Sequence, residues 1–451
     1  MQSLLEAGFS GKVYPINRKG GEAFGLKIYP SIKDVPDSID YVISSIPARS
    51  APQLITDSAA RGVKFIHLFS SGFGEIEGEE GKRLETEAVK AARQHGIRIL
   101  GPNCMGIYCP RTGLSFSIDY PGQKGFPKRS GSLGFISQSG GHSIFSIRAA
   151  PARGVYFSKL ISYGNACDLN ETDFLQYLAD DPETEIISAY IEGIKDGARF
   201  AAALKKASQL KPVILFKGGS TETGTRVAAS HTGVMSGSDR VWQGIIKQTG
   251  AIEAHSVEEI VDISLAFLRM PLLKGRNTAI IGKGGGAGVQ AADACSNAGL
   301  TLPTLPVQIR QKLTELYLSD AGRIFKNPVD VILPSDPEIF TNTFKVIADW
   351  DQIDLLIIHM SFDTWSLVDR RREQGHYVDG IINLNNVVNK DIAVVLHSDA
   401  TDEAIELSLE ARARLCEAGF PVYPSISSAS SAINKCIQYH EWRERNREDN
   451  G

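Results

Sequence analysis

The sequence predicts an α/β protein in which helices cover both faces of parallel sheets. Two observations lead to this prediction. Short apolar, β-rich runs alternate along the chain with longer stretches of helical periodicity. Several of these runs end in Gly-rich turns that pass directly into a helical stretch. Because 451 residues exceed what one compact core accommodates, the chain is expected to form more than one domain.

The predicted elements fall into three groups. The first group has a helix over residues 77–94 and strands at residues 12–17, 41–47, 65–71 and 97–103. A linker rich in Pro, Gly, Lys and Arg follows at residues 120–131, and a second break occurs near residues 270–277. The later strands are expected within residues 132–141, 155–164, 186–194, 212–219, 278–286, 355–361 and 393–398. We therefore predict three α/β domains, at about residues 1–125, 130–270 and 275–445.

The start of the chain departs from the usual order of such domains. Residues 1–9 have the pattern of the back half of an amphipathic helix, and a strand is expected directly after them. A Rossmann-like domain normally begins with a strand and a Gly-rich turn before this helix. The first domain is therefore expected to be Rossmann-like but to lack its first strand.

Composition excludes several classes of function. A net charge of −4 argues against a nucleic-acid partner, because phosphate backbones select a basic surface. No apolar run approaches the ~20 residues that a membrane-spanning helix needs, and no signal segment opens the chain, so a cytoplasmic protein is expected. The six cysteines form no CxxC pair, so we expect buried thiols, with no disulfide framework and no metal site.

A segment almost free of large apolar side chains contains a single histidine. Residues 216–239 leave a predicted strand and are rich in Gly, Ser, Thr and Ala around His231. Such a segment buries little surface and is expected to form an exposed loop. Taken alone, the pattern fits an ordinary surface loop at least as well as a loop that carries a catalytic histidine.

Two Gly-rich turns between a strand and a helix are candidate phosphate sites. Residues 137–143 read SQSGGHS and residues 280–293 read IIGKGGGAGVQAAD. Small residues allow an anion to approach the backbone, and the N–H groups of a helix N-terminus favour a negative charge. The second turn lacks the spacing of a dinucleotide fingerprint, which disfavours an NAD-linked oxidoreductase. Two such helices in successive domains suggest one phosphate held between them.

Glu192 ends the apolar run at residues 186–194. A carboxylate there requires a polar partner unless it faces water. A nucleophilic histidine needs its second ring nitrogen oriented, and a carboxylate performs this role well. Glu192 is therefore a candidate partner of His231, with a solvent-facing strand end as the alternative.

Together these motifs resemble the α subunit of the ADP-forming acyl-CoA synthetases, relatives of succinyl-CoA synthetase. The segments SHTG with SGSD, SQSGG, YIEGI, ISYGNACDL, GPNCMGI and NPVDV resemble landmarks of that family and occur in its order. The resemblance covers nearly the whole chain. It implies a Rossmann-like CoA-binding domain followed by two flavodoxin-like domains of the succinyl-CoA synthetase type.

The resemblance also implies roles for individual residues. His231 would be the phosphorylated nucleophile, and Glu192 would hold its ring. One phosphate-facing helix would open with Ser139, Gly140 and Gly141, and the other with Gly285, Gly286, Ala287 and Gly288. The CoA-binding residues would be Lys19, Ile46, Pro47, Asn103 and Met105. His142 departs from the small residue that the family usually has there.

The implied reaction interconverts acyl-CoA, ADP and phosphate with a carboxylic acid, CoA and ATP through an acyl phosphate and a phosphohistidine. The cofactors would be CoA in this chain, with ATP or ADP and Mg²⁺ on a partner. No ATP-grasp domain is found in the sequence, so an ATP-grasp β subunit and a hetero-oligomer are expected. The alternative is a catalytically degenerate CoA- or acyl-CoA-binding scaffold, which the expected lack of the first strand and Gly-rich CoA loop would favour.

Overall fold

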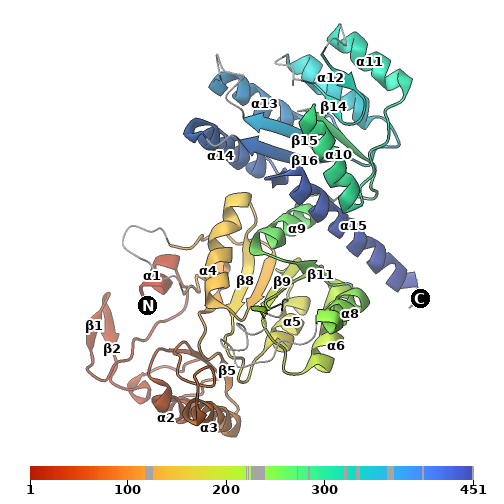
Figure 1. Cartoon of the computed structure of the whole chain (residues 1–451). Helices are drawn as coiled ribbons and strands as arrows, with labels where there is room; N and C mark the ends of the chain where they lie inside the picture. The colour runs from red at the N-terminus through yellow and green to blue at the C-terminus, as the bar shows by residue number, and fades with distance from the viewer. Residues whose placement is uncertain are drawn as a thin grey trace. The chain divides into compact units, whose positions relative to one another are not determined.

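The computed structural model describes residues 1–116, 125–219, 221, 223–224, 239–271, 273–282, 285–318, 322–331, 336–362, 370–398 and 401–448 (Figure 1). The chain divides into two compact units. The first contains Met1–Pro151 and Tyr156–Ile260, and the second contains Ala152–Val155 and Val261–Gly451. Each unit is an α/β structure built around parallel strands, as the sequence predicts.

The elements of the chain up to residue 116 are α1 (Gln2–Ala7), β1 (Gly21–Ala23), β2 (Leu26–Ile28), η1 (Ile32–Asp34), β3 (Tyr41–Ser44), η2 (Ala48–Ser50), α2 (Ala51–Ala59), β4 (Phe65–Leu68), α3 (Glu79–His95), β5 (Arg98–Leu100), β6 (Gly106–Tyr108) and η3 (Pro110–Thr112). The elements from residue 133 to residue 269 are β7 (Leu133–Ser137), α4 (Gly140–Ala149), η4 (Pro151–Arg153), β8 (Phe157–Ser162), α5 (Glu171–Asp180), β9 (Ile186–Ile191), α6 (Gly197–Leu210), β10 (Val213–Lys217), α8 (Asp239–Thr249), β11 (Ile252–Ala254) and α9 (Val257–Arg269). The remaining elements are β12 (Thr278–Gly282), α10 (Gly286–Ala298), α11 (Val307–Tyr317), β13 (Ile324–Phe325), β14 (Val329–Asp330), α12 (Pro337–Ala348), β15 (Leu355–Phe362), α13 (Arg370–Leu384), β16 (Asp391–Ser398), α14 (Asp402–Glu417), β17 (Val422–Tyr423) and α15 (Ile426–Glu448).

The N-terminal sheet consists of three parallel strands in the order β3-β4-β5. Helices α2 and α3 cover one face of it, and their core includes Ile55, Ile66 and Leu84. The strand predicted at residues 12–17 is wrong, because only Ile16 pairs there, in an isolated bridge with Tyr29. Proline at position 15 lacks the N–H that a regular ladder requires. A separate two-stranded sheet, β1-β2, follows instead.

The second sheet of the first unit has the order β11-β10-β9-β7-β8-β6. Its strands are parallel except for the edge strand β6. Counted from β7, the parallel strands follow the flavodoxin-like order 2-1-3-4-5. Helices α5, α6 and α8 contribute to the core on one face, and α4 lies on the opposite side of the sheet (Figure 1). All five residues of β7 are buried, which explains why the sequence reads as a continuous apolar run there.

The sheet of the second unit repeats this design. Its order is β13-β14-β12-β15-β16-β17, with β13 as an antiparallel edge. Counted from β12, the parallel strands again follow the order 2-1-3-4-5. The large core includes Phe340, Phe344 and Leu407 from the helices on one face. Helices α10 and α15 pack against each other, and α15 also packs against β16 and β17.

The cysteines are free, as predicted from their spacing, and five of the six are buried. Cys167 is partly exposed. Burial raises the pKa of the Cys104 thiol, so this group stays protonated at neutral pH. No helix in the described part of the chain combines the length and apolar character needed to cross a membrane.

A buried histidine makes the N-terminal sheet sensitive to acid. His67 in β4 is 2% exposed, and its Nε2 lies 3.0 Å from the Cys104 carbonyl oxygen. Its ring packs so closely on Gly106 that a Cβ at Gly106 would lie 2.4 Å from it. Burial lowers the pKa of His67 to about 4 from an ordinary 6.5. The folded state therefore holds this ring neutral.

We expect the N-terminal sheet to lose stability as the pH falls from about 6.5 to about 4. In this window the unfolded chain binds a proton on His67 and the folded chain does not, which lowers the free energy of unfolding by about 3 kcal/mol in all. Hydrogen exchange of β4 peptides at pH 7.5 and pH 5.0 measures this change. In His67→Gln, the free energy of unfolding should fall by about 2 kcal/mol less between the two pH values than it does in the wild type. An equal loss of stability in the variant and the wild type would show that His67 does not cause the acid sensitivity.

Candidate functional site

The winding of the first unit's flavodoxin-like sheet reverses beside β7. The chain passes from β7 through α4 to β8 on one side, and it then crosses back so that β9 pairs with the other side of β7. The loops after β7 and β9 therefore leave the same edge of the sheet side by side. In doubly wound sheets this position, at the carboxyl ends of the strands, is where ligands bind.

The loop after β7 forms the start of α4. Ser139 is the N-cap, and its Oγ accepts a hydrogen bond from the His142 N–H at 3.3 Å. The Ser137 hydroxyl donates to the Ser139 carbonyl at 2.8 Å and accepts from the Ser139 N–H at 3.1 Å. Gly140 and Gly141 occupy the first two helical positions. N–H groups there have no carbonyl partner within the helix, so they can serve an anion.

Gln138 ties this loop to the loop after β9, and the sequence analysis did not identify it. Its Oε1 accepts hydrogen bonds from the N–H groups of Glu192 and Gly193, the latter at 3.0 Å. Its Nε2 donates to the Gly193 carbonyl at 3.1 Å, and its N–H donates to the Tyr190 carbonyl at 3.1 Å. In the sequence, only its position inside the SQSGG motif pointed to Gln138 as a functional residue. Gln138 fixes the backbone that carries Glu192.

Glu192 is buried at the end of β9, with 7% of its surface exposed. This excludes the solvent-facing alternative. The Tyr190 phenol and Glu192 both lie against Gly218, where a Cβ would come 2.6 Å from the Tyr190 Oη and 3.2 Å from the Glu192 Cγ. Burial, and then the Glu192 charge and its hydrogen bond, raise the pKa of Tyr190. The phenol therefore remains a proton donor beside this carboxylate.

His231 lies outside the described residues, as do most of the SHTG and SGSD motifs. The chain that leads to it leaves β10 through Gly218 and Gly219, and the next described helix, α8, begins at Asp239. The start of this segment is therefore beside Tyr190 and Glu192, because Gly218 contacts both.

Two of the predicted CoA residues lie on the loop after β5, which reaches α4. The Met105 N–H donates to the Ser162 Oγ at 3.1 Å. The Met105 side chain packs on Gly140, where a Cβ would lie 2.8 Å from the Met105 Cγ. Asn103 has a positive φ of 56°, and Gly164 approaches its carbonyl so closely that a Cβ would lie 2.4 Å away. The structure thus brings Met105, predicted to bind CoA, into contact with Gly140, predicted to bind phosphate.

The remaining CoA residues lie apart from α4. Ile46 and Pro47 follow β3, at the same edge of the three-stranded sheet as the loop that holds Asn103. Lys19 is exposed on a turn where its N–H donates to the Asn17 Oδ1 at 3.0 Å. This turn precedes the β1-β2 hairpin, which Figure 1 shows at the far edge of the first unit, away from α4. The structure does not bring Lys19 to the α4 site.

The second predicted phosphate turn belongs to the second unit. Gly285 is the N-cap of α10, and Gly286, Ala287 and Gly288 form its first turn. The Gly285 N–H donates to the Asp330 carboxylate at 2.8 Å. Asp330 belongs to the NPVDV motif and was not predicted as part of a site. One N–H donor of this helix end is therefore already used by a carboxylate.

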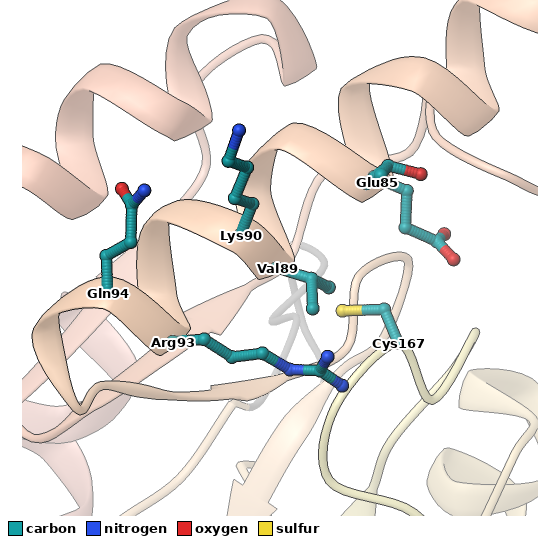
Figure 2. A pocket seen from close by; sticks show the side chains of 7 residues that line it. Glu85, Val89, Lys90, Arg93, Gln94 and Cys167 are labelled. Atoms are coloured by element: carbon teal, nitrogen blue, oxygen red, sulfur yellow. The ribbon is translucent and has the colours of Figure 1, made fainter.

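A cavity of about 560 Å³ lies beside α3, and the sequence did not predict it (Figure 2). It is lined by Glu85, Thr86, Val89, Lys90, Arg93, Gln94 and Cys167. Figure 2 shows Val89 and Arg93 of α3 reaching toward Cys167. Burial is the main cause that raises the pKa of the Cys167 thiol, so this sulfur is not a reactive thiolate at neutral pH. Within the described ranges, no cluster of His, Cys, Asp and Glu has the arrangement of a metal site.

Family models match two parts of the chain. Residues 1–110 match a CoA binding domain, and residues 130–267 match a succinyl-CoA ligase like flavodoxin domain. The chain is 33% identical to the α subunit of ADP-forming acetate–CoA ligase I from Pyrococcus furiosus, over 99% of this chain and 94% of that protein. It is also 37% identical to the ADP-forming acetate–CoA ligase of Methanocaldococcus jannaschii, over 73% of this chain and 45% of that longer protein.

A solved structure shares the fold over nearly the whole chain. It is the dinucleotide forming acetyl-coenzyme A synthetase 1 of Ca. Korarchaeum cryptofilum in complex with phosphate and ADP, with a TM-score of 0.82 and 31% identity. The match covers 99% of this chain and 93% of that one. The chain therefore belongs to the α subunits of the ADP-forming acyl-CoA synthetases, with a CoA-binding domain followed by flavodoxin-like domains of the succinyl-CoA ligase type.

Proposed function

We propose that this acid–thiol ligase subunit passes a phosphoryl group through His231, at the carboxyl ends of β7, β9 and β10. One observation carries the proposal. The N-terminus of α4 contacts Met105 through Gly140, and the buried Glu192 contacts Gly218, from which the His231 segment departs. These contacts support a site in which the thiol end of CoA, an anion-binding helix end and an orienting carboxylate lie close together.

The proposed reaction has three balanced steps. A phosphate oxygen attacks the acyl carbon of acyl-CoA, the C–S bond breaks, and the thiolate takes up a proton to give CoA. A ring nitrogen of His231 then attacks the phosphorus of the acyl phosphate and releases the carboxylic acid as its carboxylate. Finally, the terminal phosphate oxygen of ADP takes the phosphoryl group from His231 to form ATP.

The residues of this chain supply orientation and charge stabilisation, which are the main requirements of phosphoryl transfer. The α4 N-terminus, at Ser139, Gly140 and Gly141, offers N–H donors to the phosphate. The helix dipole contributes about 0.3–1 kcal/mol in an exposed site and about 2 kcal/mol in a partly buried one. The Glu192 carboxylate would accept a hydrogen bond from the N–H of the His231 ring, which leaves the other ring nitrogen free to attack. Gly285, Gly286, Ala287 and Gly288, at the start of α10, are proposed as a second phosphate-binding turn.

We assign CoA to the N-terminal domain. Asn103 and Met105 lie near its thiol end, Ile46 and Pro47 line the adenine side, and Lys19 lies near its phosphates. The contact between Met105 and Gly140 supports the first assignment. The bounds 1–125, 130–270 and 275–445 remain our proposed domain division. Three hydrophobic clusters, each mainly within one of these ranges, support it, with Leu100 and Cys104 of the first range packed in the second cluster.

ATP or ADP and Mg²⁺ are assigned to an ATP-grasp β subunit that assembles with this chain. One relative supports a second polypeptide, because it is itself named an α subunit. A cytoplasmic location remains a prediction. The whole-chain similarity to ADP-forming ligases does not favour the degenerate scaffold.

We expect phosphate to be found on the His231 peptide after the chain is mixed with Mg²⁺, ATP and an ATP-grasp subunit that phosphorylates another α subunit. Mass spectrometry at alkaline pH preserves the P–N bond and locates the label. His231→Ala should lose the label completely, while the control His255→Asn, at an exposed histidine of the same unit, should keep it. An unlabelled wild-type chain would overturn the catalytic proposal and favour the CoA-binding scaffold.

Glu192→Gln should slow phosphorylation of His231 about a hundredfold, because an amide does not stabilise the positive ring that the reaction forms. Rapid-quench measurement of the label gives the rate. Glu185→Gln is a matched control, because Glu185 is exposed and directly precedes the same strand. Equal rates for Glu192→Gln and wild type would show that Glu192 does not orient the nucleophile.

Gln138→Leu should slow the same step about tenfold and destabilise the first unit by about 1–3 kcal/mol, because two N–H groups at Glu192 and Gly193 lose their buried acceptor. Thermal unfolding measures the stability and rapid quench measures the rate. Gln53→Leu is the control, because it makes the same substitution at an exposed helix position. A loss of stability without any loss of rate would limit Gln138 to a structural role.

A further inference from the structure

An aromatic cluster lies between α4 and the ends of β9 and β10. The His142 ring stacks on the Tyr190 ring with centroids 4.0 Å apart and an angle of 12°. Phe216 packs edge-on against both, at 5.0 Å from Tyr190 and 5.7 Å from His142. These three rings come from three different elements, so each restricts the others. The stacked ring of His142 is therefore part of the packing beside the end of β9.

The cluster holds Tyr190 against Glu192. Tyr190 is 8% exposed and Glu192 is 7% exposed, so water has little access to either polar end. A buried carboxylate requires hydrogen-bond donors, and a phenol O–H is one. Gly218 limits the space on this side, because a Cβ there would lie within 2.6 Å of the Tyr190 Oη. The phenol therefore has little room to turn away from the carboxylate.

We propose that Tyr190 and His142 are positioning residues for Glu192. The Tyr190 phenol donates to the Glu192 carboxylate and fixes its orientation, and the stacked His142 ring fixes Tyr190. The inference rests on the proposed function, because it gives Glu192 the task of orienting the His231 ring. The raised pKa of Tyr190, caused by burial and then by Glu192, agrees with a phenol that stays protonated. Burial also lowers the pKa of His142, although the Glu258 charge opposes this, so the stacked ring is favoured in its neutral form.

Tyr190→Phe tests the pair, because it removes one oxygen and keeps the ring stack. The rate of His231 phosphorylation should fall about 10- to 100-fold, the range expected for losing one hydrogen bond to a charged group. The KM for CoA in the complete reaction should not change, because CoA is assigned to the N-terminal domain and not to Tyr190. Tyr177→Phe, at a tyrosine of α5 that is 51% exposed, is the matched control and should behave as wild type.

Changes at His142 test the stack separately. His142→Ala should lower the phosphorylation rate about fivefold, and His142→Phe should restore it to within about twofold of wild type because it keeps an aromatic face. In a Glu192→Gln background, Tyr190→Phe should cause no further loss, since both changes act through one carboxylate. Thermal unfolding of every variant separates these effects from loss of the fold.

The outcomes distinguish this inference from the proposed function. If the wild-type chain is never labelled, the proposed function fails and the inference fails with it. If the wild-type chain is labelled but folded Tyr190→Phe reacts at the wild-type rate, only the positioning role is overturned. Full additivity of Tyr190→Phe with Glu192→Gln would also overturn it, because Tyr190 would then act independently of Glu192.

Discussion

The reversal of winding between β7 and β9 is the constraint on which the rest of the candidate site depends. Because β8 and β9 pair with opposite sides of β7, the loops after β7 and β9 emerge together and turn apart. Gln138 then locks the two loops with hydrogen bonds from its amide. This link adds to the pairing of β7 with β9 and fixes the loop that carries Glu192 relative to the α4 N-terminus.

The free energies of the single interactions show why the site combines several of them. One helix N-terminus contributes about 2 kcal/mol at most to holding a phosphate, or less than two factors of ten in affinity. Burying a carboxylate such as Glu192 is unfavourable unless polar groups offset the loss of water. The chain meets both requirements at one sheet edge, with N–H donors on α4 and the Tyr190 phenol beside Glu192. Because these groups are already held by packing, they lose little conformational entropy during the reaction.

The sequence predicts most of the sheet architecture because the central strands are buried on both faces. The apolar runs that form β7, β9, β12 and β15 are continuous for this reason. Short edge strands such as β6 and β13 carry too few residues for a pattern, and the sequence analysis missed them. The run at residues 12–17 has consecutive apolar residues that suggested a strand, but Pro15 lacks the N–H of a regular ladder and only Ile16 pairs there.

The candidate site was predicted less completely than the fold. Ser139, Gly140 and Glu192 follow strands, so their shared edge could be inferred from the order of elements. The proposed roles of Gln138, Tyr190 and His142 depend on contacts between residues far apart in the chain, which a single sequence does not reveal. Lys19 remains a prediction that rests on the motif resemblance alone; the structure places it on an exposed turn, where its N–H donates to the Asn17 Oδ1.

The central claim is that the thiol end of CoA and the phosphate meet at the α4 N-terminus. A crystal structure of the complete chain grown with CoA and inorganic phosphate tests this most directly. The account predicts phosphate within hydrogen-bond distance of the Gly140 and Gly141 N–H groups, with the CoA sulfur beside Met105. A CoA sulfur seated elsewhere, for example in the cavity between α3 and Cys167, would contradict the account, and so would phosphate that avoids α4.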